Sequence, residues 1–125
     1  MMKPLLTFTA RTVHGAGRGK ALGTPTINLQ LEDVPDALEE GVYATAVHLE
    51  GQSHMGALHY GKRPTFDGSV ACEVHVLHET IDLLPEQVDI TVCTRLRDVQ
   101  TFETPAKLQE QISADCAAIE ALNTL

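Results

Sequence analysis

Apolar and polar residues alternate along residues 87–96, which constrains the fold more than any other feature. The apolar set is Val88, Ile90, Val92 and Leu96, and the set between them is Asp89, Thr91, Cys93 and Arg95. A period of two is that of a β-strand with one buried face. Further short strands separated by turn-forming residues are predicted at 5–13, 27–31, 41–50, 53–60 and 70–78. Six short strands indicate an antiparallel barrel, which leaves no exposed sheet edge.

The C-terminal region has a different period. Its apolar residues recur at steps of three or four, at Leu108, Ile112, Cys116, Ile119 and Leu122. This spacing predicts an amphipathic helix, with Thr104 as its N-cap and Pro105 at its first position. We expect the helix to cover one open end of the barrel. A chain of 125 residues suits a single domain spanning 1–125.

Charge and composition narrow the partners. The net charge of −8 argues against a nucleic-acid binder, whose surface is normally basic. Basic residues gather in two places, with Arg11, Arg18 and Lys20 near one loop and Lys62 and Arg63 near another. This pattern favours a small anionic ligand. With no apolar run near the roughly 20 residues of a membrane helix and no signal peptide, we expect a cytoplasmic protein, which we take to be a monomer.

The cysteines do not indicate a disulfide framework or a metal centre. Cys72, Cys93 and Cys116 are odd in number and far apart, so we predict reduced thiols, at least two of them packed as small apolar groups. A zinc site at Cys72, His75 and His78 is disfavoured because His75 points to the opposite face of a regular strand from the other two.

A glycine-rich loop at 14–23 has the composition of an anion-binding segment. Glycines let backbone N–H groups approach an anion, and Arg18 and Lys20 add positive charge. The spacing is neither that of a Walker loop nor that of a dinucleotide fingerprint. A flexible surface loop is the alternative interpretation.

Two polar pairs complete the candidate site. Thr26 and Asn28 lie two residues apart, so on a strand they share a face, and their oxygens are hard ligands suited to Mg²⁺. Local turn formation is the alternative for both residues. In the strand at 70–78, Glu73 and His75 lie opposite an apolar face made of Val70, Cys72, Val74 and Val76. Glu73 could accept a proton from an alcohol, and a merely solvated strand face is the alternative.

Taken in order along the chain, these segments resemble the riboflavin kinase family. The resemblance rests on residues 19–28 (GKALGTPTIN), 41–44 (GVYA), 61–66 (GKRPTF), 73–75 (EVH) and 96–98 (LRD) with Phe102, and on the final helix. It extends over almost the whole chain. It departs from the family at Leu84, Pro85 and Val99 and near His59, which concerns the flavin flap and the surroundings of the nucleotide.

The resemblance implies a six-stranded Greek-key barrel that transfers the γ-phosphate of ATP to riboflavin, giving FMN and ADP. Glu73 would be the catalytic base, and Thr26 and Asn28 would hold Mg²⁺, or another divalent metal, and the ATP phosphates. Segment 97–102 would be a flap over the flavin. Further ligand contacts would come from Gly17, Arg18, Gly19, Lys20, Gly23, Pro25, Arg97 and Phe102.

In bacteria, such a domain usually follows an FMN adenylyltransferase module, so we expect the chain to act as the kinase half alone. Two alternatives remain open: a barrel that binds flavin or nucleotide without turnover, and a structural barrel that binds a protein partner through an exposed apolar patch.

Overall fold

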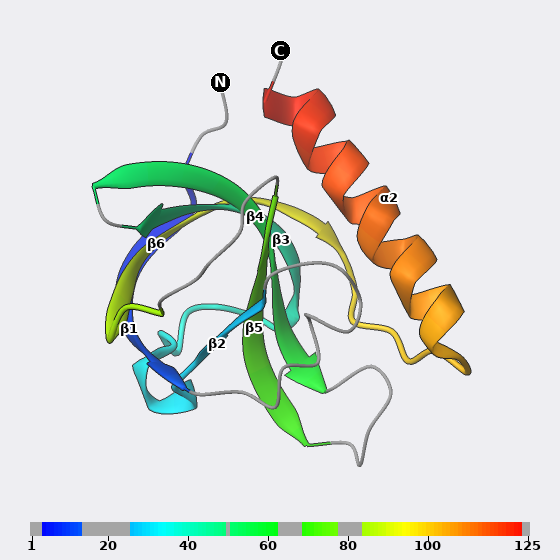
Figure 1. Ribbon diagram of the computed structural model, residues 1–125. Helices are drawn as coiled ribbons and strands as arrows, with labels where there is room; N and C mark the ends of the chain where they lie inside the picture. Colours follow the sequence, from blue (N-terminus) through cyan, green and yellow to red (C-terminus); the bar gives the residue numbers. More distant parts are fainter. Residues whose placement is uncertain (1–3, 14–25, 50, 63–68, 78–83, 124–125) are drawn as a thin grey trace.

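The computed structural model is a closed barrel of six antiparallel strands with one long C-terminal helix (Figure 1). It describes residues 4–13, 26–49, 51–62, 69–77 and 84–123. The elements are β1 (Leu6–Val13), β2 (Thr26–Leu29), the 3₁₀ turn η1 (Leu31–Asp33), β3 (Gly41–Leu49), β4 (Gln52–Lys62), β5 (Val70–Val76), β6 (Gln87–Arg97) and α2 (Pro105–Asn123).

The order of the strands around the barrel is β1-β2-β5-β4-β3-β6, and pairing of β1 with β6 closes it. Strands β3, β4 and β5 form a meander, and β6 returns to lie beside β3. This arrangement is a Greek key, so the expected fold is confirmed. Among the described residues, the pairing of β1 with β2 is the shortest in the barrel, with Thr12 opposite Leu29 and Val13 opposite Asn28.

The predicted strands are confirmed, with shifted ends. The second strand is Thr26–Leu29, one residue earlier at its start than predicted, and Leu31 lies in the 3₁₀ turn. Strand β4 continues to Lys62, into a segment that we expected to be a loop. The hairpin between β3 and β4 turns at Gly51, whose φ of 80° favours glycine.

Apolar side chains from all six strands fill the barrel. Ile27, Leu58, Val74, Ile90 and Val92 are at most 1% exposed. Val70 is an exception to the predicted apolar face of β5, because it lies at the start of the strand and is 41% exposed.

Helix α2 lies against the outside wall of the barrel, so the prediction that it covers an open end was wrong (Figure 1). Ala44 and Ala57 alternate with the inward-facing Tyr43 and Leu58, and therefore point outward. Their small side chains leave room for Ile119, which is completely buried against them. The predicted N-cap is confirmed, since the Lys107 N–H donates to Thr104 Oγ1 at 3.2 Å.

The three cysteines are free thiols, as predicted, and Cys72 and Cys93 are buried. Burial raises the pKa of the Cys72 thiol to about 12. Within the described part of the chain, no helix is long and apolar enough to cross a membrane.

Candidate active site on the outer wall of the barrel

The site is built on three neighbouring strands, β2, β5 and β4 (Figure 1). Their inward positions are taken by core residues such as Ile27, Val74 and Leu58. The alternate positions point outward, and there the register pairs Thr26 with His75 and Asn28 with Glu73. The tertiary structure therefore brings together two polar pairs that lie more than forty residues apart in the sequence.

The next strand adds a residue that sequence reasoning did not place in the site. In the register between β4 and β5, His59 lies opposite Glu73, so Asn28, Glu73 and His59 form one row across three strands. We call this set, together with Thr26 and His75, the polar row. His59 is only 8% exposed. The sequence feature that could have pointed to it is that the chain departs from the family pattern near this residue.

Within the polar row, Thr26 and His75 are hydrogen-bonded, with 3.1 Å between Thr26 Oγ1 and His75 Nδ1. Burial, together with a smaller effect of the nearby His59, lowers the pKa of His75 from 6.5 to about 4, and Asp115 of α2 opposes this shift. The imidazole of His75 is therefore neutral near pH 7. The neutral ring can accept the hydrogen of the Thr26 hydroxyl or donate to its oxygen, according to its tautomer.

The glycine-rich loop lies outside the described residues, and with it the predicted contacts at Gly17, Arg18, Gly19, Lys20, Gly23 and Pro25. Its two anchors are described. The loop leaves β1 at Val13, which pairs with Asn28, and it returns at Thr26. Both ends of the loop are thus fixed beside the polar row.

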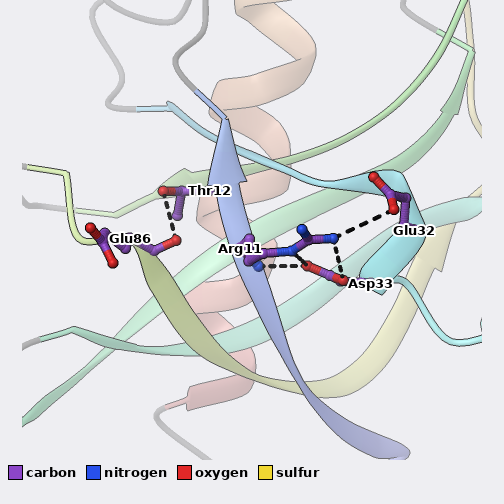
Figure 2. A network of polar contacts seen from close by, with 5 residues as sticks. All are labelled: Arg11, Thr12, Glu32, Asp33 and Glu86. Atoms are coloured by element: carbon purple, nitrogen blue, oxygen red, sulfur yellow. Dashed lines mark hydrogen bonds and ion pairs between the residues drawn. The ribbon is translucent and has the colours of Figure 1, made fainter.

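A clamp around Arg11 holds the base of this loop (Figure 2). The guanidinium donates to Asp33 at 2.9 and 3.1 Å, and the Arg11 backbone N–H donates to the same carboxylate at 2.8 Å. Glu32 lies 3.6 Å from the guanidinium. The ion pair lowers the pKa of Asp33. Arg11 is therefore paired with carboxylates. The predicted basic cluster with Arg18 and Lys20, which lie outside the described residues, stays a prediction.

An open cavity of about 620 Å³ lies at the end of β4, beyond the polar row. Its lining residues are Glu40, Lys62, Val99, Gln100 and Thr101. Lys62 is three residues beyond His59 on β4, a separation of roughly 10 Å at the rise of a β-strand. The predicted flap thus supplies one wall of a cavity, and Val99, a departure from the family pattern, faces it.

Gly61 allows the walls of this cavity to approach each other. Its φ is 145°, which favours glycine. A Cβ atom there would lie 2.8 Å from Glu40 Oε1 and 2.9 Å from Val99 Cγ2. Any side chain at this position would push the walls apart.

Arg97 and Phe102 are the two flap residues for which a ligand contact was predicted. Arg97 donates from Nε and Nη2 to both carboxylate oxygens of Asp115, at 3.0 and 2.9 Å. Its predicted ligand contact stays a prediction, and so does that of the half-buried Phe102. Sequence reasoning gave Asp115 no part in the site, although its spacing from Ile112 and Ile119 places it on the buried face of the helix.

The fold and the site together define a small Greek-key barrel with an oxygen-rich polar row on its outer wall, beside an open cavity. Residues 3–123 match the family model named Flavokinase, riboflavin kinase. The chain therefore belongs to the riboflavin kinase family.

Curated relatives are bifunctional riboflavin kinase/FMN adenylyltransferases. The protein from Pseudomonas fluorescens is 39% identical over 92% of this chain and 37% of its own length. The protein from Haemophilus influenzae is 31% identical over 95% of this chain and 39% of its own length. The chain thus spans less than half the length of these relatives.

One similar solved structure is described as a macrolide-efflux protein from Streptococcus pneumoniae. It superposes with a TM-score of 0.79 at 32% identity, over 94% of this chain and 38% of the other.

Proposed function

We propose that this chain is a riboflavin kinase, which transfers the γ-phosphate of ATP to the terminal hydroxyl of the ribityl chain of riboflavin. The observation that carries the proposal is the convergence of Thr26, Asn28 and Glu73 on one outer face of β2 and β5. Family membership supports the same activity.

The arrangement of the cavity and the polar row suits this substrate. Riboflavin has a flat ring system joined by a sugar-alcohol chain to its reacting hydroxyl. The cavity beside residues 99–101 would take the ring system, and the chain would follow β4 toward Glu73. Because the ring system and the reacting hydroxyl are separated by the ribityl chain, such a substrate needs one subsite for the ring and an adjacent one for the hydroxyl.

In the proposed reaction, Glu73 accepts the proton of the terminal hydroxyl. The hydroxyl oxygen forms a bond to the γ-phosphorus, and the bond from that phosphorus to the bridging oxygen of ADP breaks. A positioned carboxylate assists such a step mainly by aligning the nucleophile and removing its proton. His75 is the neighbouring alternative base, and burial makes it a weaker base than an ordinary histidine by lowering its pKa to about 4.

The polar row also fits a divalent metal, for which we propose Mg²⁺. Thr26 and Asn28 supply a hydroxyl and an amide oxygen, the hard donors that Mg²⁺ prefers. Among the described residues, no group of three His, Cys, Asp or Glu side chains forms a closed metal cage. Mg²⁺ typically binds few protein oxygens together with substrate phosphates, and when bound it neutralises phosphate charge.

The test is to incubate the purified protein with riboflavin, ATP and MgCl₂ and to separate FMN by chromatography. We expect FMN to form and to require a divalent metal. Folded protein that binds flavin without producing FMN, across several nucleotides and metals, would contradict the kinase proposal and favour the non-catalytic barrel.

A further inference from the structure

Helix α2 carries one buried carboxylate, that of Asp115. The residue is 6% exposed and lies between Ile112 and Ile119 on the face that packs against the barrel. Burying a carboxylate is costly unless donors surround it. Apolar residues of the helix, among them Ile119 and Cys116, also attach it to Ala44 and Ala57 of the barrel.

The donors around Asp115 come from two places. Arg97, at the end of β6, forms a two-pronged ion pair with it, and Gln111 of the same helix donates to Oδ1 at 3.0 Å. The Arg97 and Asp115 side chains are 18% and 7% exposed. Such a pair fixes orientation as well as distance, because the planar guanidinium matches both carboxylate oxygens.

The same guanidinium also holds the start of the flap. Arg97 Nη1 donates to the carbonyl oxygen of Asp98 at 3.0 Å. A second arginine, Arg95, donates to the carboxylate of Asp98 at 2.8 Å and to the carbonyl oxygen of Glu40 at 2.9 Å. Asp98 is thus held through both its backbone and its side chain, immediately before the cavity wall at 99–101.

These contacts form a continuous path from the helix to the cavity. Asp115 orients Arg97, Arg97 orients Asp98, and Asp98 leads into residues 99–101, which line the cavity with Glu40 and Lys62. The cavity wall itself has no regular secondary structure between β6 and α2. Its position therefore depends on side-chain contacts such as these.

We propose that Asp115 is a positioning residue for the flavin, which sets flavin affinity by holding the flap through Arg97. The inference rests on the proposed function, because it takes the cavity as the site of the flavin ring. It assigns to α2 a part in substrate binding in addition to its packing on β3 and β4.

The test uses Asp115→Asn, which removes the charge, and Arg97→Lys, which keeps the charge but loses the planar fork. The readouts are KM for riboflavin, KM for MgATP, kcat, and riboflavin binding followed by flavin fluorescence. We expect the riboflavin KM and Kd to rise about 10-fold in both variants, comparable to the loss of supporting contacts at other sites. The MgATP KM and kcat should stay within about twofold of wild type, since no residue of the polar row is replaced and His75 stays neutral without the charge of Asp115.

Asp33→Asn is the matched control, because it breaks another two-pronged arginine–carboxylate pair, on β1 and η1. It should leave the riboflavin KM unchanged.

Folded Asp115→Asn and Arg97→Lys variants with wild-type riboflavin affinity would overturn the inference while leaving the kinase proposal intact. An equal rise in both KM values would also overturn it, as a general structural effect. If Asp115→Asn does not fold, Arg97→Lys decides, and failure of both to fold would make the pair purely structural. A wild-type protein that forms no FMN contradicts the proposed function instead.

Discussion

Replacing Glu73 by Gln removes the proposed proton acceptor and little else. Gln keeps the size of the side chain and its capacity for hydrogen bonds, so the pairing of β5 with Asn28 on one side and His59 on the other should persist. Since polar substitutions away from the core usually change stability by about 0.5 kcal/mol or less, we expect a folded barrel.

The expected loss of activity follows from the role of the carboxylate. General-base assistance typically contributes about 10²–10⁴-fold. At about 1.4 kcal/mol per factor of ten, this corresponds to a barrier higher by about 3–5 kcal/mol. The measurement is single-turnover formation of FMN with both substrates saturating, which separates the chemical step from binding and from product release. Flavin and nucleotide affinity should remain near wild type.

Two further variants make this result interpretable. Glu110→Gln, at an exposed position of α2, makes the same chemical change outside the polar row and should leave turnover unchanged. His75→Ala tests the neighbouring alternative base. Turnover in Glu73→Gln within a few-fold of wild type, together with a collapse in His75→Ala, would refute our assignment of the base. No effect from either change would place the active site elsewhere.

Three other predictions follow from the same geometry. Thr26→Ala should raise the KM for MgATP about 10–100-fold, and the lost hydrogen bond to His75 should lower the free energy of unfolding by only about 1 kcal/mol. Thr26→Ser should keep activity near wild type, and unchanged kinetics in Thr26→Ala would leave Thr26 as a turn residue. Gly61→Ala should destabilise the fold by about 1–3 kcal/mol in urea unfolding, because its φ of 145° and the close approach of Val99 admit no side chain without strain; wild-type stability would contradict this. The free energy of unfolding should fall by up to about 3 kcal/mol as the pH is lowered from 6.5 to 4, because the pKa of His75 is about 6.5 in the unfolded chain and about 4 in the folded one. A His75→Gln variant with the same pH dependence would exclude His75 as the cause.

Local sequence patterns were sufficient for much of the fold. The two-residue period at 87–96 and the three-to-four-residue period after Pro105 each describe one element, and the structure contains β6 and α2 there. Cap and turn residues such as Thr104 and Gly51 act on their immediate neighbours. Such signals are local because hydrogen bonding and side-chain direction repeat along a single element.

The placement of the helix was not predictable in this way. The spacing of Ile112 and Ile119 shows which face of α2 is buried but not what buries it. Whether that face meets an open end or the outer wall depends on the small side chains of Ala44 and Ala57 on two other strands.

Local patterns predicted the strands and the helix of this chain, and the family resemblance singled out Thr26, Asn28 and Glu73 as candidate site residues. Which side chains meet depends on the pairing of strands and the docking of the helix. The register of β2 on β5 brings Asn28 beside Glu73, that of β4 on β5 adds His59, and α2 brings Asp115 to Arg97. Strand register and helix docking are set by contacts between residues far apart in the chain, to which no local period is sensitive.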